Sequence, residues 1–190
     1  MKHEMNSRHT KQMLADALIS LSNHKPFSKI TISELVSCCN INRKTFYYHF
    51  SDIYDLLEWH LNNEVSLALS SFDSMDSIKD IHTTVAYATN YMFQRSYLKN
   101  LIQDPLAREK VMLIMHKAVY PTVYQFLEEL EQTQGQTLDL DCKNFLAKNL
   151  SRVIILSSFD AIEHPEEYDI EKIQQYLSAI FCISTNGLFR

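Results

Sequence analysis

The sequence predicts an all-α protein, with a small N-terminal domain followed by a larger helical one. Only two glycines and four prolines occur in 190 residues, which is too few turn residues for a protein built on sheets. Hydrophobic residues make up 46% of the chain and recur at helical spacing, so a helical core can form. The scarcity of glycine also excludes the glycine-rich loops that bind nucleotide phosphates, and with them most nucleotide-dependent enzymes.

The first predicted helix spans about residues 10–22. Its apolar residues form a single stripe, which is typical of a helix that packs one face against a core; they are Leu14, Ala17, Leu18 and Leu21. The sequence NHKPF follows, and Pro26 cannot continue a helix. A chain break is therefore expected directly after residue 22.

A capping box opens the second helix, which we expect over residues 32–38. In the sequence TISE, the Thr31 hydroxyl can accept the amide hydrogen of Glu34, and the Glu34 carboxylate can accept the amide hydrogen of Thr31. Residues 39–41 leave room only for a tight turn, in which Asn40 can adopt the left-handed conformation. Asn42 then caps a third helix over residues 43–50. Two short helices joined by about three residues predict a helix-turn-helix.

The third helix combines buried rings with an exposed basic and aromatic face. Phe46 and Phe50 are four residues apart and point to one side, so they anchor the helix on the core. The basic and aromatic side chains on the other faces are Arg43, Lys44, Tyr47 and Tyr48. Arginine and lysine donate to guanine edges and phosphates, and tyrosine contacts phosphates and thymine methyl groups. The pattern therefore indicates a helix that reads a DNA major groove.

The charge distribution agrees with a DNA contact at one end of the chain. Residues 1–50 carry seven Lys/Arg and three acidic residues, a net charge of +4, whereas residues 51–190 carry a net charge of −9. A basic segment on an acidic body suits a protein that binds a polyanion with one end only. Charge asymmetry on ordinary solvated helices would give the same totals, so this observation supports the interpretation without deciding it.

Six further helices are expected after a cap at Ser51-Asp52. They span about residues 53–70, 77–94, 97–103, 106–133, 142–162 and 170–186. Residues 70–77 form a polar break, and Asp104-Pro105 starts the helix that Pro121 should kink. Gly135 and Gly187 each follow a helix end, where glycine is favoured. Helix 142–162 is apolar most of the way round, so we expect it to pack against its own core and against a second copy of the chain.

Residues 10–57 resemble the DNA-binding domain of the TetR family of bacterial transcriptional regulators. The resemblance covers about the first third of the chain and rests on the segments TKQMLADALISL, PFSKITISELVSCCNINRKTFYYHF and SDIYDLL. The run FYYHFSDIYDLLEW is similar to a branch that includes regulators of dihydroxyacetone-kinase and zinc-efflux operons. The chain departs from the family at two positions: Asn40 replaces the turn glycine, and Ile53 replaces a lysine that contacts phosphate.

The resemblance implies a helix-turn-helix domain over residues 1–52 and an effector-binding and dimerisation domain over residues 53–190. It assigns base contacts to Arg43, Lys44 and Tyr47, and phosphate contacts to Thr31, Ser33, Thr45, Tyr48 and His49. Asn42 lies on the same surface, and the positive charges of Lys29 and Lys11 add to it.

The resemblance also implies an effector pocket between the central helices and a homodimer formed by the last two. The candidate pocket residues form a methionine and aromatic set, which at helical spacing is also common in a protein core; they are Tyr87, Tyr91, Met112, Met115, His116, Tyr120 and Tyr124. The candidate interface residues are Phe145, Leu150, Val153, Ile154, Phe159, Ile173, Tyr176, Leu177 and Ile180.

The remaining chemistry-bearing residues predict neither a cofactor nor a bound metal. The histidines and cysteines are not at metal-ligand spacing, and packing is the expected role of the adjacent Cys38 and Cys39, with redox sensing as the alternative. We find no nucleophile motif and no pair of catalytic carboxylates, so an enzyme is not expected. Met1–Thr10 is polar and no apolar run reaches the ~18 residues of a membrane span, so we expect a cytoplasmic protein with no membrane partner.

These observations together predict a dimeric, sequence-specific regulator of transcription that binds double-stranded operator DNA and responds to a small-molecule effector. Repression is the family default. An activator or co-activator that acts through a partner protein is the alternative, and Ile53 in place of a phosphate-contacting lysine favours it slightly.

Overall fold

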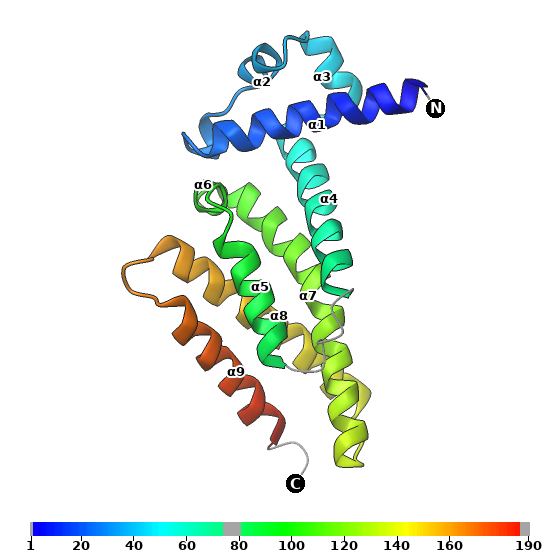
Figure 1. Ribbon diagram of the computed structural model, residues 1–190, viewed down its shortest axis with the longest axis vertical. Helices are drawn as coiled ribbons and strands as arrows, with labels where there is room; N and C mark the ends of the chain where they lie inside the picture. The colour runs from blue at the N-terminus through cyan, green and yellow to red at the C-terminus, as the bar shows by residue number, and fades with distance from the viewer. Residues whose placement is uncertain (1, 74–80, 187–190) are drawn as a thin grey trace. The chain divides into compact units, whose positions relative to one another are not determined.

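The computed structural model describes residues 2–73 and 81–186, and the side chains of residues 7–70 and 82–185. The described residues form helices and connecting turns only, so the predicted all-α fold class is confirmed (Figure 1). The helices are α1 (Lys2–Ser22), the 3-10 helix η1 (Phe27–Lys29), α2 (Ile32–Cys38), α3 (Arg43–His49), α4 (Ile53–Asp73), α5 (Ile81–Phe93), α6 (Leu98–Ile102), α7 (Pro105–Gln134), α8 (Leu140–Glu163) and α9 (Ile170–Asn186).

The helices lie where the sequence predicts them, but several begin or end at residues other than those predicted. Helix α1 begins eight residues earlier than predicted, because no proline or glycine interrupts residues 2–10. Helix α4 continues through Asp73, so the first part of the polar segment 70–77 is helical, and the rest lies outside the described residues, as does Gly187. The 3-10 turn η1 was not predicted.

The predicted start of α7 is confirmed in detail. The Ala107 amide donates to the Asp104 carboxylate at 2.9 Å, so Asp104 caps the helix that Pro105 begins. Helix α7 continues through Pro121 to Gln134, and Gly135 follows it in the left-handed conformation with φ of 65°. A glycine adopts this conformation without steric cost, which explains why it follows the end of the helix.

The chain divides into two compact units. The first comprises residues 1–67 and 96–114, so it contains α1 to α3, most of α4, α6 and the start of α7. Figure 1 shows α2 and α3 (lighter blue) against one side of α1 (dark blue). The core of this unit is formed by fully buried side chains from these helices, among them Leu14, Leu18, Phe27, Leu35, Phe46, Leu56, Leu57, Leu61, Leu98 and Leu101.

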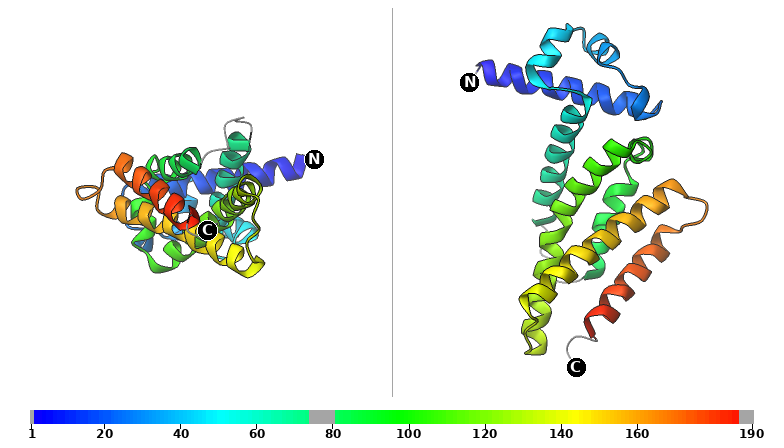
Figure 2. Two further views of the ribbon diagram at one scale, coloured as in Figure 1. Left: turned by 90° about the horizontal axis from the view of Figure 1, so that it is seen from below. Right: turned by 180° about the vertical axis from the view of Figure 1, so that it is seen from behind.

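The second unit comprises residues 68–95 and 115–190. Helices α5, α8 and α9 pack against one another, and Figure 2 shows α8 and α9 as an antiparallel pair joined by a short turn. The core of the unit consists of Val85, Val123, Leu127, Ala147, Leu150, Ile154, Ala161, Ile173, Leu177 and Phe181. Among the helices of the described residues, none is long and apolar enough to cross a membrane.

Candidate DNA-binding surface and effector region

The turn between α2 and α3 forms as the sequence predicts. Asn40 adopts a positive φ of 50°, the left-handed conformation that asparagine tolerates better than most residues. The Asn42 side chain accepts hydrogen bonds from the Thr45 amide at 2.8 Å and from the Thr45 hydroxyl at 3.1 Å. The Thr45 amide also donates to the Asn42 backbone carbonyl at 3.1 Å, so the Asn42 side chain strengthens the first turn of α3 and marks where the helix begins.

The capping box at the start of α2 is also present. The Thr31 amide donates to the Glu34 carboxylate at 2.9 Å, and the Glu34 amide donates to the Thr31 hydroxyl at 3.3 Å. The sequence did not reveal a further partner: the Lys25 ammonium donates to the same carboxylate at 2.5 Å. The hydrogen bond from Lys25, followed by those from Thr31, lowers the pKa of Glu34 from 4.5 to about 2.

Helix α3 buries its phenylalanines and exposes its basic and aromatic side chains. Phe46 is fully buried and Phe50 is nearly so. Tyr47 is 51% exposed and Tyr48 is 71% exposed. Both tyrosines are more exposed than is usual for large aromatic side chains in folded proteins. The exposed positions of the predicted DNA surface are Lys29, Thr31, Ser33, Asn42, Arg43, Lys44, Tyr47 and Tyr48, whereas Thr45 and His49 are half-buried.

A lysine from α1 adds a positive charge near the end of α3. The Lys11 ammonium lies 5.4 Å from the centre of the Phe50 ring and 5.8 Å from that of Trp59, and both rings stabilise its charge. Burial lowers the pKa of His49, and the charge of Lys11 lowers it further. His49 therefore favours its neutral form in the free protein, next to a fixed positive charge.

The predicted effector residues divide between the two units. Met112 belongs to the first unit, and the other six belong to the second. On α7, the rings of His116 and Tyr120 lie 5.7 Å apart, and those of Tyr120 and Tyr124 lie 6.0 Å apart, so the three form a continuous aromatic stripe. Met115 is buried.

The polar atoms of this aromatic set differ in whether they have partners. The Tyr87 hydroxyl donates to the Ala68 carbonyl at 2.7 Å, and the Tyr120 hydroxyl donates to the Asn144 side chain at 3.0 Å. The guanidinium of Arg95 stacks on the Tyr91 ring at 3.4 Å. The buried His116 Nε2 atom has no hydrogen-bond partner among the described residues.

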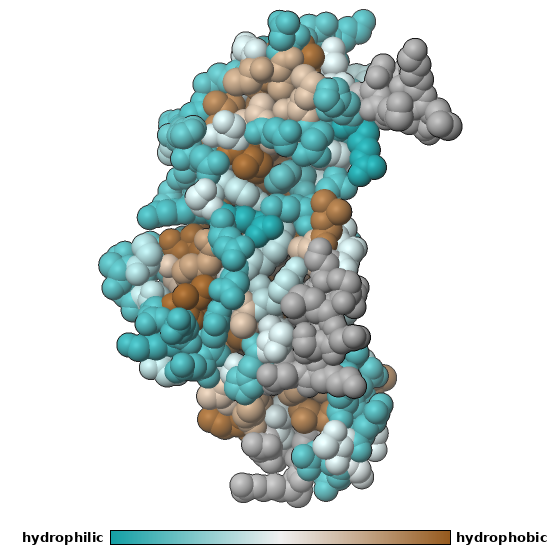
Figure 3. All heavy atoms as spheres, in the orientation of Figure 1, coloured by the Kyte–Doolittle hydropathy of each residue, from teal (hydrophilic) through white to brown (hydrophobic). Residues whose placement is uncertain are grey.

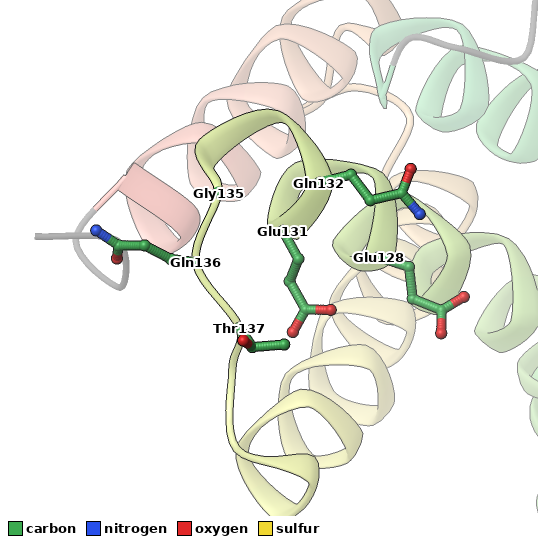
Figure 4. Close-up of a pocket in the computed structure, with 6 residues that line it drawn as sticks. All are labelled: Glu128, Glu131, Gln132, Gly135, Gln136 and Thr137. Carbon is green, nitrogen blue, oxygen red and sulfur yellow. The ribbon is translucent and has the colours of Figure 1, made fainter.

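A surface groove of about 330 Å³ at the turn between α7 and α8 contains none of the predicted effector residues (Figure 4). Figure 4 shows Glu131 pointing toward the connection that carries Thr137. The Glu131 carboxylate accepts hydrogen bonds from the Leu138 amide and from the Lys143 ammonium, each at 2.7 Å. Lys143 lowers the pKa of Glu131, and Glu131 in turn raises the pKa of Lys143. This ion pair joins α7 to α8.

The predicted interface residues lie on two sides of α8 and α9. Leu150, Ile154, Phe159, Ile173 and Leu177 are buried within the single chain, and Val153 is half-buried. Three remain exposed and available to a partner, namely Phe145, Tyr176 and Ile180. Leu156 and Ile183 are also apolar and exposed on the same two helices.

Metal-ligating side chains converge at one place in the described chain. Ligand atoms of His164, Glu166 and Glu167 lie within 4.8 Å of one another in the turn between α8 and α9, and all three residues are exposed. Exposed acidic groups of this kind are common without a metal ion, so the cluster does not by itself make a metal centre.

Neither a protein-family model nor a curated protein matches the chain. Solved structures do match over most of their length. The chain is 14% identical to "Dihydroxyacetone kinase operon activator DhaS", with a TM-score of 0.68 over 94% of this chain and 97% of that one. It is 12% identical to the fatty acid degradation regulator FadR from Bacillus halodurans, with a TM-score of 0.63 over 90% and 93% of the two chains.

A third match is the transcriptional regulator FadR from Bacillus subtilis in complex with stearoyl-CoA, at 12% identity and a TM-score of 0.63, over 89% of this chain and 96% of that one. At such identities a structural match establishes the fold, and it agrees with the fold that the resemblance of residues 10–57 implied. The chain therefore has the fold of these helix-turn-helix transcriptional regulators.

Proposed function

We propose that this protein is a sequence-specific regulator of transcription that binds double-stranded DNA as a homodimer and responds to a small-molecule effector. One observation carries the proposal: α3 is capped at Asn42, anchored by Phe46, and exposes Arg43, Lys44, Tyr47 and Tyr48 together. Two exposed tyrosines beside two cations are not required for a solvated helix to form. In contrast, the base edges and phosphates of a DNA major groove can bind all four side chains.

The surface around α3 supplies two kinds of contact. Arg43, Lys44 and Tyr47 reach base edges, and they determine which sequence is bound. Thr45, Tyr48 and His49 contact phosphates from α3, while Thr31 and Ser33 do so from the start of α2. Lys29 adds a sequence-independent attraction to phosphate, which makes binding sensitive to salt.

Effector control is proposed for the second unit. Its support is the aromatic stripe of α7 together with the unpartnered His116 Nε2 atom. One structural neighbour was solved with stearoyl-CoA, so a related fold does bind a small molecule. An effector can regulate DNA binding only if its affinity differs between the DNA-bound and free conformations of the dimer.

The expected action is repression, and activation is the second candidate. The neighbour DhaS is an operon activator. In addition, Ile53 stands at the start of α4, where the TetR family places a phosphate-contacting lysine, so DNA affinity without a partner is expected to be lower. An activator that requires a partner protein would bind its operator tightly only when that partner is present.

The test is a titration of the purified protein against DNA from upstream of its own gene, with a scrambled duplex as control, at two salt concentrations. We expect tight, salt-sensitive binding to the upstream DNA with two subunits, or a multiple of two, per site. Weak and equal binding to both duplexes would favour the activator with a partner protein.

Variants then test the assignment of α3. Arg43→Ala should weaken operator binding by about 1–3 kcal/mol, roughly 5- to 150-fold, and relax the preference at one base position. Lys117→Ala removes an exposed charge from α7 and serves as the control, for which no change is expected. Equal affinities for the two variants would show that α3 does not read the DNA.

A further inference from the structure

Helix α1 begins well before the core of the first unit. Among its described side chains, the first buried one is Leu14, whereas the helix itself begins at Lys2. About 18 Å of helix therefore precede Leu14, at 1.5 Å per residue. Figure 1 and Figure 2 both show this segment continuing past α3 toward the N-terminus. The start of α1 adds little to the core, so its side chains can face another molecule.

Two cations in this segment lie on the side of α1 that packs against the rest of the first unit. Arg8 precedes the buried Ala15 by seven residues, and Lys11 precedes the buried Leu18 by seven. Seven residues are almost two full turns, so each pair lies within about 20° around the helix axis. Arg8 is nevertheless exposed and Lys11 is half-buried, because both precede the part of α1 that the core covers.

Both cations lie near the end of α3. The Lys11 ammonium is 5.4 Å from the centre of the Phe50 ring and 5.8 Å from that of Trp59. Burial lowers the pKa of His49, the last residue of α3, and the charge of Lys11 lowers it further. Arg8 comes one turn earlier, about 4.5 Å along α1. Arg8 and Lys11 therefore continue the DNA surface of α3 beyond His49, and we call these two residues the basic row of α1.

The positive charge of the basic row is not neutralised within the described part of the chain. Among the described side chains, no ion pair involves Arg8 or Lys11. Asp16 follows them on α1, but it lies on the exposed side of the helix and accepts a hydrogen bond from Gln12 at 2.8 Å. Figure 3 shows teal, hydrophilic atoms where the described part of α1 begins. Two unpaired cations side by side suit a polyanion.

The start of α4, which also follows the end of α3, carries the opposite charge. Residues 51–57 contain two acidic residues, Asp52 and Asp55, and no lysine or arginine. Both carboxylates are exposed and fixed by backbone hydrogen bonds, to Asp52 from the Tyr54 amide at 2.8 Å and to Asp55 from the Ser51 amide at 2.9 Å. Fixed negative charges repel a phosphate strand, whereas the basic row attracts it. A DNA strand that leaves the end of α3 is therefore favoured on the side of α1.

We propose that the basic row of α1, formed by Arg8 and Lys11, binds backbone phosphates of the operator beyond those that α2 and α3 contact. This inference rests on the DNA binding of the proposed function and adds a second contact surface to it. Because phosphates carry no base identity, the row strengthens binding and makes it more sensitive to salt, but it leaves the sequence preference to α3.

The salt dependence of binding to the upstream duplex tests the inference. Arg8→Ala removes one charge per subunit, and alanine favours the helix. A dimer then loses two phosphate contacts, so its slope of log affinity against log salt should be shallower by about 1.8, and between about 50 and 200 mM salt its affinity should fall about 12-fold less than that of the unaltered protein. Arg8→Lys keeps the charge and should keep the slope. Lys11→Met keeps an apolar stem over Phe50 and Trp59 and should resemble Arg8→Ala.

Ethylation interference on the same duplex locates the contact. Ethylation of at least one phosphate in each half-site should weaken binding of the unaltered protein and have no effect on Arg8→Ala, while the base preferences stay the same. Lys99→Ala is the matched control, because it also removes an exposed charge from the first unit. Lys99 lies on α6, which contacts the opposite end of α1 through the hydrogen bond from Asn100 to the Ser22 carbonyl. This variant should keep the slope and the phosphate pattern of the unaltered protein.

Three results would overturn the basic row while leaving DNA binding intact. The first is an Arg8→Ala protein with the salt slope and phosphate pattern of the unaltered protein. The second is an equal change of slope in Lys99→Ala, since net charge alone would then explain the effect. The third is a relaxed base preference in Arg8→Ala, because a phosphate contact does not read bases. An unaltered protein that binds the upstream and scrambled duplexes weakly and equally would instead count against the proposed function. Circular dichroism spectra check that the variants keep their helix content.

Discussion

The short helix α3 and the long helix α8 both carry predicted binding residues, but they present them differently. In α3, the two buried rings and the exposed basic and aromatic side chains were separated correctly from the sequence. In α8, Leu150 and Ile154 are buried in the single chain while Phe145 is exposed, although all three are apolar. A helix with one apolar face shows which side is buried, whereas a helix that is apolar on two sides does not.

The largest expected effect is a difference in the free energy of unfolding between substitutions on the buried and exposed faces of α3. Phe46→Ala removes a fully buried ring and should lower the free energy of unfolding by about 3–5 kcal/mol. Tyr48→Ala, on the exposed face, should change it by less than about 0.5 kcal/mol. Urea unfolding measures both. Comparable losses from the two substitutions would mean that Tyr48 packs against the protein and is not free to contact DNA.

A smaller difference in stability is expected between substitutions on the buried and exposed sides of α8. Leu150→Ala should lower the free energy of unfolding by about 2–5 kcal/mol at every protein concentration, because its side chain fills the core of the single chain. Phe145→Ala should lower stability only at concentrations where the protein is dimeric, because binding of a second copy stabilises the folded state by mass action. Thermal unfolding at several dilutions distinguishes the two. A Phe145→Ala loss that persists on dilution would contradict the assignment of this residue to the dimer face.

The smallest effect concerns the start of α2. Because the folded pKa of Glu34 is about 2 and the unfolded value is 4.5, the stability that this carboxylate confers is present above pH 4.5 and is lost as the pH falls from 4.5 toward 2. Glu34→Gln should flatten the dependence of unfolding on pH in this window. Glu109→Gln, another exposed carboxylate of the first unit, serves as the control. If both variants keep the slope of the unaltered protein, Lys25 and Thr31 do not stabilise the charged form.

Short-range sequence signals explain why the structure of α2, α3 and the turn between them could be predicted closely. The capping box at Thr31, the left-handed Asn40 and the cap at Asn42 each depend on residues within four positions of one another, and all three are confirmed. The ion pair between Lys25 and Glu34 was missed, because its partners are nine residues apart and lie on different sides of a proline. The same limit applies to the buried pair between Glu131 and Lys143, which joins the ends of two helices.

The sequence by itself determined the helices, their caps and the exposed face of α3, because hydrogen bonds and periodicity within a few residues decide these features. Only the tertiary structure decided which side of α8 packs on α5, α7 and α9 and which side remains exposed, because that choice depends on residues far apart in the chain. It also placed Asp160, Tyr176 and Ile180 around one groove. The sequence shows that Lys148 and Arg152 are charged. Only the tertiary structure shows that they are exposed on the same face of α8 as Leu156 and Asp160.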